Sequence, residues 1–198
     1  MPDPIRAFVS IKPPAEVVDQ ITALQKRMAD GISGVRWVGS EGIHLTLKFL
    51  GDIDRDRVET VGRTLVDAVA GMTPFLLTVK GVGVFPSIQR PRVIWAGAAA
   101  EAHRLFALQQ AVEEGLETVG FARERRRFRG HLTLGRVKGR LDSAGLMNLL
   151  HREREFFIEP FPVAQIILFQ SRLKPTGAEY TSLVQAPLAG RPEPATPE

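Results

Sequence analysis

One tetrapeptide, His-Leu-Thr-Leu, occurs twice in this chain, as residues 44–47 and 131–134. In an extended strand successive side chains point to opposite faces, so each copy would place His and Thr on one face and both Leu on the other. The leucine face can pack into a core. Two such strands brought together would surround one cleft with two imidazoles and two hydroxyls.

Two histidines and two threonines around one cleft could perform acid–base chemistry on a phosphate without a metal. The unperturbed pKa of histidine is about 6.5, so one imidazole can take a proton from an attacking water while the other gives a proton to a leaving oxygen. Threonine hydroxyls can donate hydrogen bonds to non-bridging phosphate oxygens. The two copies are identical, so the residues alone do not decide which histidine is the acid.

The surroundings of both copies resemble the paired His-x-Thr motifs of the two-histidine (2H) phosphoesterase superfamily. Within it, the chain is similar to the bacterial and archaeal RNA 2′,3′-cyclic phosphodiesterases, also called 2′-5′ RNA ligases. The segments that carry this resemblance are residues 37–51, residues 127–137 and three further blocks, which are 5–9, 83–86 with 90–97, and 169–171 with 177–180. Together they span about residues 4–185.

This resemblance implies an activity and a set of site residues. The activity is hydrolysis of the 2′,3′-cyclic phosphate ends of RNA, such as tRNA fragments, to 2′-phosphomonoesters, with a reverse ATP-independent 2′-5′ RNA ligase reaction. His44 would be the proton donor and His131 the proton acceptor. Thr46, Thr133 and Arg136 would bind the substrate phosphate. The sequence has no Walker-type phosphate loop, which agrees with a reaction that needs no ATP.

Basic residues near the motifs are the candidate RNA contacts. If a strand runs from residue 126 to residue 137, alternate arginines before His131 share its face, and the residue four positions after His44 shares the face of His44. The candidates are Lys48, Arg125, Arg127 and Arg129. They could attract an RNA backbone to the mouth of the cleft. The alternative interpretation of the arginine run is a solvated loop.

Arg136 raises a geometric difficulty. It lies five residues after His131, which puts it on the opposite face of a regular strand. A β-bulge or the end of the strand would have to turn it toward the site.

Composition limits the other possibilities. The chain has 198 residues and no cysteine, and 44% of its residues are hydrophobic, so we expect a globular protein without disulfides or thiolate metal sites. The first residues lack a signal peptide and no apolar run could cross a bilayer, which favours the cytoplasm. The net charge of +4 favours anionic partners. We expect a monomer without a cofactor. We also expect no metal, because threonine is not a usual zinc ligand.

The hydrophobic pattern predicts a mixture of helices and strands. Helices are expected from Pro14 to Gly31, from an Asp54 cap to Gly71, over a face from Leu105 to Val119 that includes Phe106, and from a Ser143 cap to Leu150. Strands are expected at 5–11, 35–38, 43–50, 75–84, 93–98, 126–137, 156–159, 163–171 and 179–184.

The order of these elements favours an α+β fold. The helices do not separate every successive pair of strands, so we expect largely antiparallel sheets. The resemblance implies two pseudo-symmetric lobes, each an antiparallel sheet flanked by helices, with both motifs in a central cleft. Residues 1–188 would form this one domain, and the proline-rich residues 189–198 a disordered tail.

Two other functions remain open at this stage. One is a 2H phosphoesterase for a small cyclic nucleotide or an ADP-ribose cyclic phosphate. The other is a non-catalytic RNA-binding module, although such a module has no chemical need for two imidazoles. The aromatic candidates for stacking on a base are Phe8, Trp37, Phe49, Phe85 and Trp95, and core packing would explain most of them.

Overall fold

Helices and strands alternate irregularly along the chain. The computed structural model describes residues 4–139, 141–174 and 177–190. The elements in chain order are β1 (Ile5–Ile11), α1 (Ala15–Ala29), β2 (Val35–Trp37), β3 (Leu45–Ile53), α2 (Arg57–Val69), β4 (Phe75–Phe85), β5 (Val93–Ala100), α3 (Arg104–Thr118), β6 (His131–Val137), α4 (Ser143–Arg152), β7 (Phe157–Val163), β8 (Gln165–Lys174) and β9 (Gly177–Pro187), with short 3₁₀ turns at Ser40–Gly42 and Glu101–His103.

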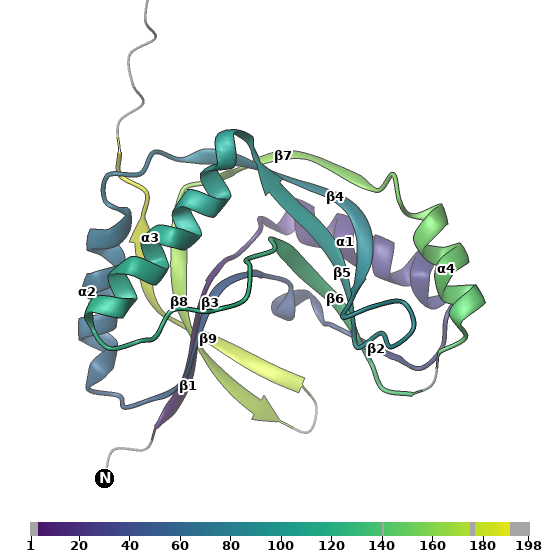
Figure 1. Cartoon of the computed structure of the whole chain (residues 1–198), viewed down its shortest axis with the longest axis horizontal. Coiled ribbons are helices and arrows are strands. Elements are labelled where there is room, and N and C mark those ends of the chain that lie inside the picture. Colours follow the sequence, from purple (N-terminus) through teal and green to yellow (C-terminus); the bar gives the residue numbers. More distant parts are fainter. Residues whose placement is uncertain (1–3, 140, 175–176, 191–198) are drawn as a thin grey trace, which may run out of the picture.

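All nine strands belong to one curled antiparallel sheet (Figure 1). Its order is β7-β4-β5-β6-β3-β1-β8-β9, and the short β2 pairs with β6. The two central strands, β6 and β3, are joined through a single residue pair, Leu45 with Leu132. The sheet therefore divides into two halves, β7-β4-β5-β6 and β3-β1-β8-β9. This architecture confirms the predicted α+β fold with two lobes.

The two halves exchange helices. Helix α1 follows β1 in one half but packs against β6 in the other, and α3 follows β5 but packs against β3. The predicted apolar face of α1 is confirmed, because Val17, Val18, Ile21, Leu24 and Met28 are all buried. Under these helices the leucines of both motifs are buried as well. Each motif strand is therefore held from behind by the helix that begins in the opposite half.

Three details of the predicted helices are wrong. Helix α2 begins at Arg57 without a side-chain cap, because Asp54 lies one turn too early and accepts the Arg57 N–H through its backbone carbonyl (3.1 Å). Helix α4 is capped by Asp142 rather than by Ser143, since the Asp142 carboxylate accepts from the second and third backbone N–H groups of the helix. Phe106 points outward and is 49% exposed.

The C-terminal end of the described chain packs against the body. The Leu188 side chain is buried, and the Gly190 N–H donates to the Met72 carbonyl (2.9 Å). Residues 191–198 of the predicted tail lie outside the described residues. Among the described helices, we find none with the length and apolar character that a membrane crossing requires.

Candidate active site

The two motifs meet at the centre of the sheet. Because β3 and β6 are antiparallel and Leu45 pairs with Leu132, this register sets Thr46 opposite His131 and His44 opposite Thr133. The two histidines are then diagonal neighbours, which in regular pairing lie about 7–8 Å apart. That separation leaves room for a phosphate between two imidazoles.

Each motif ends in a β-bulge at its second leucine. In the first copy Thr46 pairs with Ser10 and Lys48 with Val9, so Leu47 has no partner of its own on β1. In the second copy the pairing shifts in the same way between β6 and β5, and Leu134 is the unpaired residue. In both copies the bulged leucine and the residue after it are consecutively buried, which a regular alternation would not allow.

The bulges decide which later residues face the site. Because alternation restarts after the extra residue, the fifth position after each histidine returns to the motif face. These positions are Phe49 and Arg136, and both side chains are exposed. The bulge that Arg136 needed is therefore present. The Arg136 charge lowers the pKa values of His44, His131 and Tyr180, so its guanidinium lies near all three.

The Lys48 side chain does not share the face of His44, contrary to what regular alternation had predicted. The bulge turns its side chain to the buried side of β3, where its ammonium pairs with the Glu113 carboxylate and donates to the Ala122 carbonyl (2.8 Å). The side chains of Lys48 and Glu113 are each only 4% exposed. Lys48 is thus not an open cation on the face of His44, and the expectation from regular alternation was wrong.

Each imidazole interacts with the backbone two residues before it. The Nδ1 of His131 lies 2.7 Å from the Arg129 carbonyl oxygen, and because a carbonyl only accepts, this nitrogen carries the hydrogen and leaves Nε2 with a free lone pair. A hydrogen bond with the backbone of Gly42 raises the pKa of His44. Aromatic rings fix both orientations. Phe8 and Tyr180 lie 4.8 and 5.2 Å from the His44 ring, and Phe85 lies 5.0 Å from the His131 ring, all between centroids.

Burial favours the neutral form of both histidines. It lowers the pKa of His44 to about 4, and the positive charge of Arg136 adds to this effect, whereas the hydrogen bond with Gly42 opposes it. The pKa of His131 is lowered by burial too, and the hydrogen bond to Arg129 opposes that shift. At pH 7 about one His44 in a thousand is protonated in the free protein.

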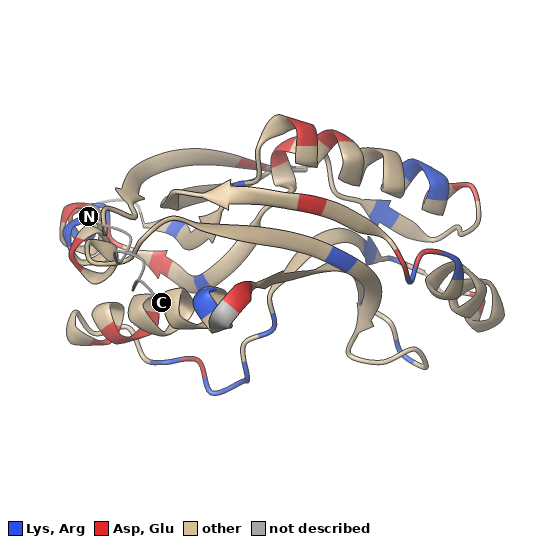
Figure 2. Ribbon diagram, turned by 90° about the horizontal axis from the view of Figure 1, so that it is seen from above, with Lys and Arg blue, Asp and Glu red and all other residues tan. Residues whose placement is uncertain are grey.

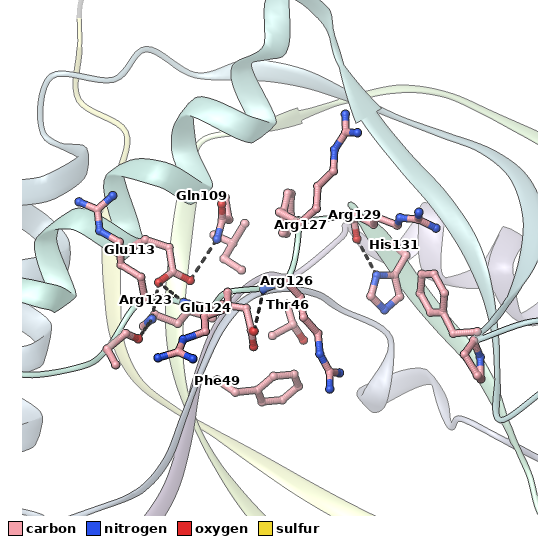
Figure 3. Close-up of a pocket in the computed structure, with 17 residues that line it drawn as sticks. Thr46, Phe49, Gln109, Glu113, Arg123, Glu124, Arg126, Arg127, Arg129 and His131 are labelled. Atoms are coloured by element: carbon pink, nitrogen blue, oxygen red, sulfur yellow. Dashed lines mark hydrogen bonds and ion pairs between the residues drawn. The ribbon is translucent and has the colours of Figure 1, made fainter.

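A cavity of about 1060 Å³ opens on one side of the motifs. Thr46 and His131 are among its lining residues, and the segment 121–130 between α3 and β6 forms one wall (Figure 3). His44 and Thr133 are not among its lining residues, so the four motif residues and the cavity overlap only in part. The cavity is therefore suited to hold the part of a substrate that extends from one end of the site.

The segment 121–130, here called the arginine segment, is irregular and does not extend β6 as predicted. Alternation therefore does not select Arg125, Arg127 and Arg129. All five arginines of the segment line the cavity, including Arg126, which the strand pattern had assigned to the other face. Figure 2 shows this largely basic stretch after α3. Among the described residues only one of the five, Arg123, has a carboxylate partner (Glu114 and Glu117).

Of the aromatic candidates, Phe49 alone is exposed. Its ring is 66% exposed and lies at the cavity, across from the arginine segment (Figure 3). Phe8 is buried beside His44, Trp37 packs against the core, and Phe85 and Trp95 pack against each other with ring centroids 5.1 Å apart. Comparing the fifth position after the histidine of each motif would have singled out Phe49 as the counterpart of Arg136.

Within residues 4–139, 141–174 and 177–190, we find no group of three or more His, Cys, Asp or Glu side chains that could hold a metal ion.

Comparison with known proteins finds the same family twice, in two successive stretches of the chain. The model of the family described as LigT-like phosphoesterase matches the chain twice, over residues 11–95 and 97–180, with one motif in each match. The curated RNA 2′,3′-cyclic phosphodiesterase of Methanothermobacter thermautotrophicus is 30% identical over 90% of this chain and 96% of its own length. That of Thermotoga maritima is 32% identical, over 94% of this chain and 97% of its own length.

Solved structures share the fold. A crystal structure of a Thermus thermophilus protein superposes with a TM-score of 0.77 and 27% identity, covering 94% of this chain and 99% of that one. Escherichia coli LigT in complex with 3′-AMP superposes with a TM-score of 0.73 at 22% identity, with the same coverage. From the two matches of the family model, the two motifs and these relatives, the chain belongs to the LigT-like phosphoesterase family.

Proposed function

We propose that this protein is an RNA 2′,3′-cyclic phosphodiesterase that hydrolyses cyclic phosphate ends to 2′-phosphomonoesters. The observation that carries the proposal is the pair of His-Thr motifs, set opposite each other across β3 and β6 with the Arg136 charge beside both histidines. The names of the relatives support RNA as the class of substrate. We further propose that the protein acts as a monomer in the cytoplasm.

In the proposed reaction, water attacks the phosphorus in line with the 3′ oxygen of the ribose. The free Nε2 of His131 takes the proton from the water, the bond from phosphorus to the 3′ oxygen breaks, and His44 protonates that oxygen. Thr46, Thr133 and Arg136 stabilise the charge on the non-bridging oxygens. The product carries a 2′-phosphate. A 5′-hydroxyl in place of water would form a 2′-5′ linkage without ATP.

His44 can act as an acid only if the substrate raises its pKa. In the free site burial and Arg136 hold that pKa at about 4. A bound phosphate adds a negative charge beside the imidazole and offsets Arg136, which favours the protonated form. Substrate binding and protonation of His44 are therefore coupled.

The cavity supports RNA rather than a small cyclic nucleotide as the substrate. It extends from Thr46 and His131 past Phe49 along the arginine segment, a path that suits a chain of nucleotides. Phe49 offers an exposed ring on which a base can stack, and the arginines offer charge to the phosphates. The structurally similar E. coli LigT forms a complex with the nucleotide 3′-AMP.

The first test uses a short RNA ending in a 2′,3′-cyclic phosphate, with EDTA present. We expect the wild type to give a 2′-phosphate end and His44→Ala and His131→Ala to give none. If the protein hydrolyses only small cyclic phosphates, its substrate is such a compound and not RNA. RNA binding without turnover of any cyclic phosphate would indicate a binding module, and rescue by zinc after EDTA would overturn the metal-free chemistry.

A second test separates acid from base, because the two motifs are identical in sequence. A p-nitrophenyl phosphodiester has a leaving group that departs without a proton. We expect this substrate to restore activity to His44→Ala, which lacks the proposed acid, and not to His131→Ala. Restoration of the His131 variant instead would exchange the two roles.

A further inference from the structure

Lys48 and Glu113 form a buried ion pair at the base of the cavity, and the proposed phosphate chemistry does not use it. Lys48 lies on β3 two residues after Thr46, and Glu113 lies on α3. Neither side chain is open to solvent, so the pair cannot itself attract RNA. It therefore needs another explanation.

The pair anchors the beginning of the arginine segment. The Lys48 ammonium donates to the carbonyl of Ala122 (2.8 Å), and the Glu113 carboxylate accepts the backbone N–H of Glu124 (3.2 Å). The same carboxylate accepts from the Gln109 side chain (3.1 Å), which fixes its orientation (Figure 3). Two backbone groups of an otherwise irregular segment thus end on one buried ion pair.

The other end of the segment is anchored on the sheet. The Gly130 carbonyl accepts the N–H of Ala98 (3.0 Å), directly before His131 begins β6. Between the two anchors lie four arginines without a carboxylate partner among the described residues, namely Arg125, Arg126, Arg127 and Arg129. Their mutual repulsion favours an open segment, so the anchors must hold the wall in place.

A buried ion pair is seldom the most stable choice, because apolar side chains of similar size often do as well. We propose that Lys48 and Glu113 are positioning residues: they hold the arginine segment as a fixed wall of the cavity and so set the affinity for the RNA chain beyond the reacting phosphate. This inference rests on the proposed function.

The expected effect can be worked from the salt dependence of RNA binding. Each phosphate contact to a single strand contributes about −0.7 to the slope of log affinity against log salt, so four contacts give about −2.8. Between about 50 and 200 mM salt the KM for RNA would then rise about 50-fold. If half of the contacts are lost with the anchor, the rise falls to about sevenfold.

The test replaces the pair by apolar residues in Lys48→Met/Glu113→Leu, so that no buried charge is left unpaired. Its control is Arg27→Met/Glu153→Leu, which removes a partly buried ion pair between α1 and the residue directly after α4, in the other half. For each protein we would measure thermal unfolding, the KM for an RNA with a cyclic end at both salt concentrations, kcat on a mononucleoside 2′,3′-cyclic phosphate, and cleavage by trypsin within residues 123–129.

We expect the Lys48/Glu113 variant to lose the steep salt dependence and to be cut faster at the arginine segment, with kcat on the mononucleotide within about threefold of wild type. The proposal would be overturned if this variant kept the wild-type salt slope of KM and the wild-type rate of trypsin cleavage. It would also be overturned if the variant lost activity equally on the RNA and on the mononucleotide. If wild type turns over neither substrate, the proposed function fails. The inference is then judged by trypsin cleavage and by the salt dependence of binding of a fluorescent RNA.

Discussion

Acidification should destabilise this protein through its two motif histidines, and His44 has the larger, separable share. Burial and Arg136 lower the pKa of His44 from an ordinary value of 6.5 to about 4 in the folded protein. The unfolded chain therefore binds more protons than the folded chain between these values, and stability must fall as pH drops through that window. The full shift corresponds to about 3.4 kcal/mol, of which about 2.5 kcal/mol is lost between about pH 7.5 and about pH 4.5.

The measurement is urea unfolding, followed by circular dichroism, of wild type and His44→Gln at both pH values. All other titrating groups are shared, so the difference between the two losses reports His44. We expect wild type to lose about 2.5 kcal/mol more than the variant. Losses equal to within about 0.5 kcal/mol, an ordinary limit for such comparisons, would show that His44 is as free to ionise when folded as when unfolded.

Three further predictions concern residues that the bulges place. Arg136→Met removes a positive charge and is expected to raise the pKa values of both histidines, which NMR titration would measure. It is also expected to lower kcat about 10²-fold, because a phosphate contact is lost. Unchanged histidine titrations would mean that the guanidinium does not lie near them. Gly135→Ala is expected to cost about 1–3 kcal/mol in urea unfolding, because its Cβ would lie 2.6 Å from a Val35 methyl, whereas Gly139→Ala, with nothing within 4 Å, serves as the control. Phe49→Ala is expected to weaken RNA binding and so raise the KM for RNA, because one base stack, worth about 1–3 kcal/mol of binding free energy, is lost. Phe49→Tyr retains the stack, and an unchanged KM in Phe49→Ala would exclude stacking.

Side-chain alternation predicts the site within each four-residue motif and fails from the first residue after it. The pattern His-Leu-Thr-Leu correctly separates a core face from a cleft face, because within the motif the strands are regular. The bulge that follows is a property of how β3 pairs with β1, and it leaves no trace in the local sequence of apolar and polar residues. Lys48 was consequently assigned to the wrong face, and Phe49 was one aromatic candidate among five.

Helix faces were predictable where helix ends were not. The buried stripe of α1 follows directly from the spacing of five apolar residues, because burial of that stripe stabilises the helix. At α2 and α4 several residues that can cap a helix lie within two positions of one another, so the sequence does not decide among them: α2 has no side-chain cap and α4 is capped by Asp142. The arginine segment resembles a strand by alternation, but no neighbouring strand pairs with it, so it remains irregular.

The near-symmetry of the site raises the question of how it distinguishes the two oxygens of a cyclic phosphate. The His and Thr residues, their hydrogen bonds two residues back, and the bulges are alike in both halves. What differs is the fifth position after the histidine, Phe49 in one half and Arg136 in the other, together with the cavity, which Thr46 and His131 line but His44 and Thr133 do not. If that asymmetry orients the ribose, Phe49→Ala should yield some 3′-phosphate beside the 2′-phosphate when the ends are separated by chromatography, while Phe49→Tyr should yield 2′-phosphate alone. A product of pure 2′-phosphate from Phe49→Ala would mean that the orientation is set by Arg136 and the arginine segment without the ring.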